Sequence, residues 1–374
     1  MSLFEKTLIG NLAVANRFVR SATAEGLATA RGFCSPALTK LLVRLAKGGV
    51  GLIITGHTAV SREGMAAPRQ LCLWDDGFIS ALVDMTGQVH EAAGKIFLQL
   101  AHAGAQADAA LTGEAAMGPM MTRKKDGTIC RAMSLDDIRK TTLAFAAAAG
   151  RARKAGFDGV QIHAAHGCLL STFLSPHYNH RRDEYGGTVA NRARFLLEAV
   201  AAVVNETGSD YPVLVKLNVS DFLPDGFAAD QMLETAALLV SSGICAIELS
   251  GGIEGDAKFQ PSRPGTIFLE QEGYYKKEAA QLKEAVDLQV ILGGGIRSLE
   301  TAADFIADEV CDFIAMARPF IREPELIDRW KTNNKKSSAC ESDNLCYRPI
   351  QAGKGLYCLT KARELQRTLL KKRN

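Results

Sequence analysis

The sequence predicts one closed (β/α)8 barrel, of class α/β, followed by a short cysteine-containing extension. Short apolar runs alternate with segments of helical apolar spacing eight times along the chain, which indicates parallel β-α units. No GxGxxG sequence follows any of these runs, which argues against a separate dinucleotide-binding domain. We therefore expect the barrel to fill residues 1–332 and a tail packed on the barrel to fill residues 333–374.

Each expected element has the length typical of its class. The expected strands are short and rich in Val, Ile and Leu, and they cover 17–20, 51–54, 96–100, 159–162, 213–217, 246–249, 290–292 and 312–316. The expected helices repeat apolar residues every three or four positions, and they cover 36–47, 78–93, 135–154, 191–205, 230–241, 274–286, 299–306 and 323–331. Segments 61–74, 104–133 and 253–273 are expected to be loops, and they would shape the mouth of the barrel.

Composition excludes several classes of protein. A net charge of +3 is too small to indicate nucleic acid or a membrane as a partner. No apolar run reaches the roughly 18 residues of a membrane-spanning helix, and no basic-then-apolar leader is visible. The nine cysteines lie in core-like segments, which suits a reducing compartment. We expect a cytoplasmic protein that acts on a small molecule, with a homo-oligomer left open.

Two histidines, His163 and His166, follow the expected strand at 159–162. Catalytic groups in barrels of this class lie at the carboxyl ends of strands. Two imidazole N–H groups aimed at one point can hold and polarise an electron-rich oxygen. A hydrogen-bonded structural pair, or half of a metal site, is the alternative. His163 and His166 are therefore candidate catalytic residues.

A glycine-rich turn indicates a phosphate site late in the barrel. The strand at 290–292 runs into three glycines and then a helix, so that backbone N–H groups can approach an anion. The next strand, at 312–316, is followed by an arginine, and the loops after strands 7 and 8 are the usual phosphate-binding place in such barrels. A tight turn without a ligand is the alternative. The candidate residues are Gly293, Gly294, Gly295, Ala317 and Arg318.

Two polar residues inside expected strands fit the edge of a flavin ring. The Gln99 amide can both donate to and accept from a pyrimidine. Lys216 is a charge within an apolar strand and needs a partner, which a negatively charged flavin ring would supply. The alternatives are a polar layer inside the barrel for Gln99 and an ion pair with Asp221 for Lys216.

Together these residues resemble the old yellow enzyme family, the FMN-containing NAD(P)H:flavin oxidoreductases and ene-reductases. The resemblance covers about residues 3–330. It rests on NRFVRSAT at 16–23, GGVGLII at 48–54, QLAHAG at 99–104, FLSP at 173–176 and NHRRDEYGG at 179–187.

The resemblance implies FMN at the carboxyl ends of the strands and NADH or NADPH as the reductant. It implies that backbone groups of four residues line the ring, namely Ser21, Ala22, Thr23 and His57. It also places Gln99 at the pyrimidine, Lys216 at the N1/O2 side, and the glycine turn with Arg318 at the phosphate. His163 and His166 would hold the carbonyl oxygen, or another electron-withdrawing group, of the substrate.

The chain departs from the family pattern in three places. Cys168 replaces the tyrosine that protonates the substrate two residues after the second histidine, and Ala24 stands where a threonine or cysteine often lies near flavin O4. In the tail, Cys340, Cys346 and Cys358 resemble the cluster motif of the 2,4-dienoyl-CoA reductase and trimethylamine dehydrogenase branch. Asp343 stands where the second of the four cysteines would be, so we expect no stable iron–sulfur cluster. The three cysteines are then a remnant of the motif, with a three-ligand zinc site or ordinary packing as the alternatives, and no metal-binding residue is assigned.

Three hypotheses for function follow. The favoured one is an FMN-dependent oxidoreductase that takes hydride from NAD(P)H and passes it to an enone-like C=C acceptor by a ping-pong mechanism. The second is a dienoyl-CoA-reductase-like or dehydrogenase/demethylase-like flavoenzyme that uses a partner for electrons. The third is a flavin-binding protein without ene-reductase activity.

Overall fold

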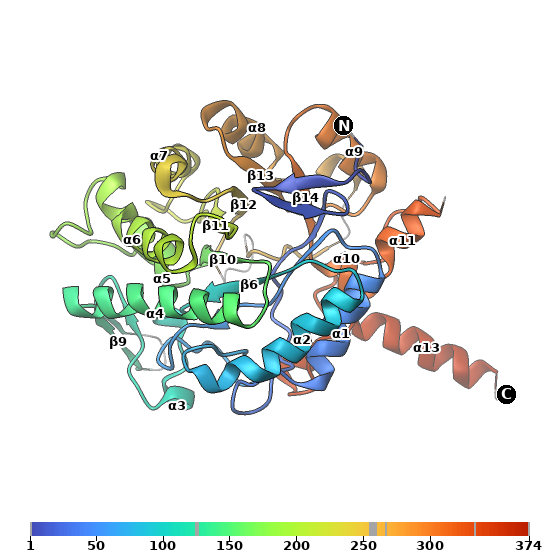
Figure 1. Ribbon diagram of the computed structural model, residues 1–374, viewed down its shortest axis with the longest axis horizontal. Helices are drawn as coiled ribbons and strands as arrows, with labels where there is room; N and C mark the ends of the chain where they lie inside the picture. Colours follow the sequence, from blue (N-terminus) through green and yellow to red (C-terminus); the bar gives the residue numbers. More distant parts are fainter. Residues whose placement is uncertain (1, 124–126, 254–259, 266–267, 333, 373–374) are drawn as a thin grey trace.

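Eight parallel strands form a closed barrel in the computed structural model, which describes residues 2–123, 127–253, 260–265, 268–332 and 334–372 (Figure 1). The barrel closes because β10 pairs with β11 on one side and with β6 on the other. The strands are β3 (Phe18–Arg20), β4 (Leu52–Ile54), β6 (Ile96–Ala101), β10 (Gly159–Ala164), β11 (Val213–Asn218), β12 (Ala246–Ser250), β13 (Gln289–Leu292) and β14 (Phe313–Met316). The predicted (β/α)8 class is confirmed.

Helices alternate with these strands around the outside of the barrel (Figure 1). They are α1 (Pro36–Lys47), α2 (Ile79–Glu91), α4 (Leu135–Lys154), α6 (Val189–Thr207), α7 (Ala229–Leu239), α8 (Lys276–Ala285), α9 (Leu299–Ala307), α10 (Arg318–Arg322) and α11 (Leu326–Lys331). Side-chain oxygens of Ser35, Ser134, Thr188 and Ser298 accept from backbone N–H groups at four helix starts. Hydroxyl caps of this kind explain why those helices begin where they do.

The interior of the barrel is divided into an apolar floor and a polar upper layer. Inward-facing residues at the amino-terminal half of the strands form one buried apolar cluster of Val19, Leu52, Ile54, Phe97, Leu214, Ala246, Ile291, Phe313 and Ala315. A hairpin of β1 (Thr7–Ile9) and β2 (Leu12–Val14) covers this floor with Ile9 and Val14. On β6, β11 and β12, the side chains two residues after this cluster are polar, namely Gln99, Lys216 and Glu248. Together with Ser21 and Gln161 they form the upper layer described below.

Short elements surround the mouth of the barrel. They are β5 (Thr58–Ala59), η1 (Asp76–Phe78), η2 (Gly104–Gln106), α3 (Ala109–Thr112), α5 (Leu169–Leu174) and η4 (Leu269–Gln271), whereas η3 (Val240–Ser242) lies between α7 and β12 at the opposite end of the barrel. The expected loop 104–133 also contains a small sheet of β7 (Met117–Gly118), β8 (Thr122–Arg123) and β9 (Ile129–Ala132). Residues 124–126 of this loop, and 254–259 and 266–267 of the loop 253–273, lie outside the described residues.

The tail first follows the barrel and then leaves it. Ser338 N–H donates to Arg297 O (2.8 Å), and Leu356 N–H donates to Glu25 O (2.8 Å). Two helices, α12 (Tyr347–Gln351) and α13 (Leu359–Lys371), complete the tail. No residue of α13 is buried, and the helix extends away from the barrel (Figure 1). Among the described residues, no helix has the length and apolar character needed to cross a membrane.

Candidate active site

His163 and His166 lie together at the carboxyl end of β10. His163 is in the strand, beside Lys216 of β11, and His166 is in the following loop with a left-handed φ of 63°. Their ring centroids are 5.1 Å apart, with the rings edge to face. His166 Nε2 is hydrogen bonded to Ser250 Oγ (2.6 Å), and its backbone N–H donates to Asn218 Oδ1 (3.2 Å). Within the described part of the chain, the buried His163 Nδ1 has no hydrogen-bond partner.

Burial keeps this histidine pair neutral. Desolvation lowers the pKa of both imidazoles well below the ordinary value. The nearby positive charge of Lys216 lowers both values further. Because a neutral imidazole has one N–H donor and one acceptor nitrogen, each ring can donate one hydrogen bond to a bound oxygen without carrying a charge.

Five polar side chains form a buried chain below the histidines. Lys216 Nζ donates to Ser21 Oγ (2.8 Å) and to Glu248 Oε1 (2.9 Å), and Ser21 Oγ donates to the same carboxylate oxygen (2.5 Å). Gln161 Nε2 donates to Glu248 Oε2 (2.7 Å), and Gln99 Nε2 donates to Gln161 Oε1 (2.8 Å). Lys216 therefore pairs with Glu248, whereas Asp221 accepts from Asn218 Nδ2 and Phe227 N–H. The alternative of a Lys216–Asp221 pair is wrong.

The segment after β3 is fixed by a buried ion pair. Arg20 Nη1 lies 2.9 Å from Glu25 Oε1, and Glu25 Oε1 also accepts from Gly56 N–H (2.8 Å). Ser21 N–H donates to Met316 O, and Thr23 Oγ1 donates to Ser21 O. These bonds hold residues 21–23, including the half-buried Ala22, at the rim of the barrel.

His57 lies on the loop after β4, with a defined tautomer. Its Nδ1 is 2.6 Å from Gln70 Nε2, and Gln70 Oε1 accepts from Ala66 N–H (2.7 Å). Because an amide nitrogen only donates, His57 Nδ1 accepts and the ring proton lies on Nε2. Burial lowers the pKa of His57 to about 4.

The glycine turn after β13 has the backbone shape that a phosphate loop needs. Gly294 and Gly295 have φ of 109° and 77°, values that favour glycine. A Cβ on Gly294 would meet the Tyr274 ring at 2.9 Å. The amides of Arg297 and Ser298 already donate to Glu272 Oε2 (2.9 and 3.1 Å). The glycine amides, rather than the start of α9, are therefore the groups that an anion could use.

The match to known proteins decides the family. Residues 2–337 match the model of the NADH:flavin oxidoreductase / NADH oxidase family. The chain belongs to this family. The cofactor of the family is FMN, with NADH or NADPH as the reductant, and the predicted resemblance is confirmed.

Three relatives define the similarity more closely. The NADH oxidase of Thermoanaerobacter brockii is 34% identical over 329 residues, which are 87% of this chain and 50% of that protein. The 4,4'-dithiodibutanoate disulfide reductase of Rhodococcus erythropolis is 30% identical over 380 residues, or 94% of each chain. The solved old yellow enzyme homologue from Zymomonas mobilis has a TM-score of 0.77 and 28% identity, covering 91% of this chain and 96% of that one. The chain thus spans about half the length of the NADH oxidase.

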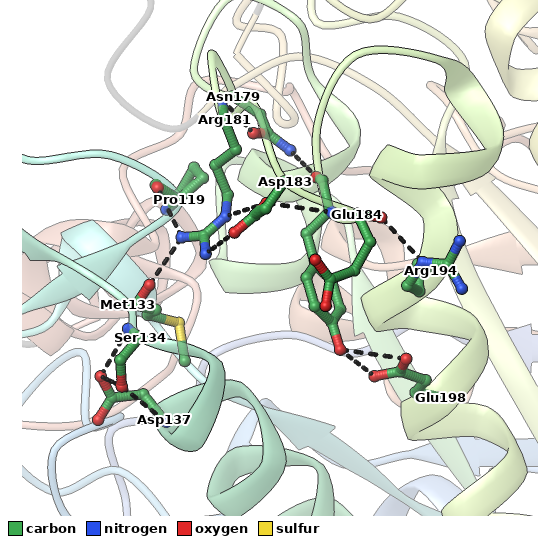
Figure 2. Close-up of polar contacts among 11 residues, drawn as sticks. Pro119, Met133, Ser134, Asp137, Asn179, Arg181, Asp183, Glu184, Arg194 and Glu198 are labelled. Atoms are coloured by element: carbon green, nitrogen blue, oxygen red, sulfur yellow. Dashed lines mark hydrogen bonds and ion pairs between the residues drawn. The ribbon is translucent and has the colours of Figure 1, made fainter.

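The most distinctive motif of the family resemblance, at 179–187, fastens the small sheet to the barrel (Figure 2). Arg181 Nη1 donates to Met133 O (2.7 Å) and Pro119 O (3.2 Å), and its guanidinium pairs with Asp183 (2.5 Å). Glu198 accepts from the Tyr185 hydroxyl (2.9 Å), which ties the same loop to α6. The motif therefore supports the mouth of the barrel rather than supplying reacting groups.

Cys168, at the position of the family's tyrosine, is the residue before α5. Its N–H donates to Ala165 O (3.2 Å), and its side chain is half-buried. A thiol reaches less far from the backbone than a phenol. Cys168 therefore places a shorter side chain where the family has a tyrosine.

Arg318 follows β14 and is held by the tail. Its Nη1 donates to Arg263 O (2.8 Å), Asn344 Oδ1 (2.8 Å) and Ser342 O (3.3 Å). Ala317, just before it, is the residue preceding α10. The tail therefore fixes the arginine predicted for the phosphate.

The three tail cysteines line one cavity, together with Asp343 and Arg318. Asp343 Oδ1 accepts from Leu345 N–H (3.0 Å), and Oδ2 accepts from the Thr360 hydroxyl. Both oxygens of the residue at the position of the missing second cysteine are thus already used by the protein. Within the described ranges, no group of three or more Cys, His, Asp or Glu could hold a metal ion.

Sequence reasoning overlooked four polar partners of the predicted residues, namely Gln161, Asn218, Glu248 and Ser250. Gln161 and Glu248 each interrupt an apolar strand, which is the same signal that drew attention to Lys216. Asn218 and Ser250 end their strands, so only the register of the barrel shows that they face His166.

Proposed function

We propose that this protein takes hydride from NADH or NADPH and passes it to an electron-poor C=C acceptor of the enone class, by a ping-pong mechanism at a single site. The observation that carries the proposal is the neutral His163–His166 pair above the Lys216 chain. His163 Nδ1, buried and without a partner among the described residues, is the strongest sign that a ligand completes this site.

The residues present fit FMN, which when bound would supply the hydride chemistry. Gln99 and Lys216 would hold the pyrimidine side of the ring, and residues 21–23 with His57 would line it. Gly293, Gly294, Gly295, Ala317 and Arg318 would hold the phosphate. The positive φ of two of these glycines and the fixed guanidinium support this assignment.

In the acceptor half-reaction, His163 and His166 would donate to the carbonyl oxygen of the substrate. Negative charge grows on this oxygen as hydride reaches the β-carbon, so the two donors stabilise the transition state more than the ground state. Neutral rings suit this role, since they donate hydrogen bonds without losing a proton to the substrate.

This chain differs from its family at the step in which the α-carbon of the substrate is protonated. Cys168 occupies the position of the donor, but general acids must come within about 3 Å of the atom that they protonate. We expect the shorter thiol to fall outside that distance, so water or another group delivers the proton. Cys168 then contacts the substrate, and reduction of simple enones is slow.

Absorbance and steady-state kinetics test the proposal together. Purified protein should show the flavin bands of non-covalent FMN, and NADH or NADPH should bleach them. Cyclohexenone should then restore the colour under anaerobic conditions. Protein that is colourless and cannot be reconstituted with FMN would refute the proposal, and bleaching that no enone reverses would favour a flavin-binding protein without ene-reductase activity. An organic disulfide belongs in the same assay, because the relative matched over 94% of its length is a disulfide reductase.

The second candidate is a dienoyl-CoA-reductase-like or dehydrogenase-like enzyme that receives electrons from a partner. The three tail cysteines favour it, but a four-iron cluster needs four soft ligands and Asp343 is a hard one. We expect no stable cluster. Four iron atoms per chain, with matching sulfide, in anaerobically prepared protein would overturn this expectation and support the second candidate.

A small-molecule substrate, a cytoplasmic location and the absence of nucleic-acid and membrane partners remain part of the main proposal.

A further inference from the structure

A single carboxylate stands at the centre of the polar layer. Glu248 is the direct neighbour of Lys216 in the register of β11 and β12, and Gln161 is the direct neighbour of Gln99 in the register of β10 and β6. The Glu248 side chain is 1% exposed and that of Lys216 is 5% exposed. The polar chain therefore runs across four adjacent strands, from the predicted lysine to the predicted glutamine.

The hydrogen bonds in this chain can run in one direction only. An ionised carboxylate accepts and cannot donate. Gln161 must therefore turn its Nε2 toward Glu248 (2.7 Å), which leaves Gln161 Oε1 to face Gln99. Gln99 must then turn its own Nε2 toward Gln161 (2.8 Å). The Glu248 carboxylate thereby decides which way the Gln99 amide points, although the two side chains are linked only through Gln161.

From this arrangement we infer that Glu248 is a positioning residue for FMN, with two separate effects. It orients the Gln99 amide toward the pyrimidine edge through Gln161, and it offsets the charge of Lys216 beside the N1/O2 side. The inference rests on the proposed function, because it takes Gln99 and Lys216 as the residues that hold the ring.

The second effect has a predictable sign. Reduction adds negative charge to the pyrimidine side of the cofactor, and a positive neighbour favours that change. Lys216 alone would raise the midpoint potential of bound FMN. Because the carboxylate of Glu248 lies 2.9 Å from the ammonium group, the pair has no net charge, and the potential stays lower than a lone lysine would set it.

Three variants separate the two effects. E248Q removes the charge and allows the amide chain to reverse, so the FMN dissociation constant should rise about tenfold, as expected for one or two lost hydrogen bonds, and the midpoint potential should become more positive. Q161L breaks the link between Glu248 and Gln99 but leaves the Glu248–Lys216 ion pair in place, so FMN should bind more weakly while the potential stays near the wild-type value. E248D keeps the charge, so it should keep the wild-type potential.

D158N provides the matched control. Asp158 is also a mostly buried carboxylate that pairs with a lysine, since Lys95 Nζ lies 2.9 Å from its Oδ1. That pair precedes β6 and β10, at the amino-terminal end of the barrel, so neither the potential nor the FMN dissociation constant should change in D158N.

Spectroelectrochemical titration and FMN titration of the apoprotein supply the readouts. Equal potentials and equal dissociation constants in wild type and E248Q would overturn the inference. The same holds for a potential that moves as far in E248D as in E248Q. If E248Q does not fold, an unchanged FMN dissociation constant in Q161L is sufficient to overturn it. Wild-type protein that never binds FMN would contradict the proposed function instead.

Discussion

The floor and the upper layer lie inside the same barrel, yet they use opposite chemistry. The floor consists of closely packed apolar side chains covered by the β1–β2 hairpin. Further along β6, β10, β11 and β12, and in the loop after β10, the upper layer contains an ion pair, two amides and two neutral histidines. Apolar burial stabilises the fold, whereas buried polar groups add little to stability and leave atoms for a ligand. The comparison places apolar stabilisation at the floor and the binding chemistry above it.

The largest expected effect is a loss of stability when a cavity is made in the floor. Phe97 is fully buried in the apolar cluster, and its ring fills the space beside Gly159. Phe97→Ala should reduce the free energy of unfolding by about 3–5 kcal/mol, through lost burial and the cavity left behind. Urea unfolding of the wild type and the variant measures this loss. A change below 1 kcal/mol would mean that the floor does not carry the stability assigned to it.

Removing the histidines should affect binding rather than folding. Replacing His163 and His166 together by Ala should abolish the binding of phenolic ligands and slow the acceptor half-reaction, since one good oxyanion donor contributes about 3 kcal/mol. FMN should stay bound, and the free energy of unfolding should fall by less than in Phe97→Ala. Stopped-flow kinetics and ligand titration test this prediction. An unchanged acceptor rate contradicts the assigned role.

Buried histidines near the carboxyl ends of the strands should also make the free energy of unfolding depend on pH. Burial lowers the pKa of His102, which follows β6, to about 4, as it does for His57. Unfolded histidine takes up a proton below about pH 6.5, so between pH 6.5 and 4 the unfolded state binds more protons than the folded state. Stability should therefore fall as the pH is lowered through this window, by about 1.4 kcal/mol per pH unit for each histidine.

Urea unfolding at pH 7, 5.5 and 4.5 measures this slope. In His102→Gln, the change in the free energy of unfolding with pH should be smaller by the contribution of one histidine, about 1.4 kcal/mol per pH unit. Phe97→Ala should keep the wild-type pH dependence because it alters only the floor. Equal slopes in the wild type and His102→Gln would show that His102 is not held neutral by burial.

The smallest expected effect is a gain at Cys168. Cys168→Tyr restores the phenol of the family and should raise the rate of enone reduction by about tenfold. This gain is smaller than the hundredfold at the lower end of typical general acid–base effects. The rate of flavin reduction by NAD(P)H should not change. Cys168→Ser is the control, and if it abolishes an already rapid enone reduction, then the thiol itself is the proton donor.

The sequence was sufficient to predict the barrel because its strands and helices have distinct periods, and the bounds of α1 and α4 agree with those expected. It was also sufficient to single out Gln99 and Lys216 among the polar residues that point inward from apolar strands, although Gln161 and Glu248 give the same signal. It did not reveal the partner of Lys216, because Glu248 lies 32 residues further along the chain and becomes its neighbour only through the register of β11 and β12. The β1–β2 hairpin was overlooked although Gly10 and Asn11 form a typical two-residue turn between alternating segments.

The hairpin at the floor has a consequence for the synthesis of the protein. Gly10 N–H donates to Gln289 Oε1 and Gln289 Nε2 donates to Leu8 O, so the hairpin is anchored to a residue made 279 positions later. At roughly 5–20 residues per second, the ribosome needs about 14–56 s to add that stretch. During this time the floor that Ile9 and Val14 cover is incomplete, because Ile291, Phe313 and Ala315 have not yet been made. The hairpin therefore cannot take its final place until most of the barrel has been made, and the same is true of β3, which pairs with β14.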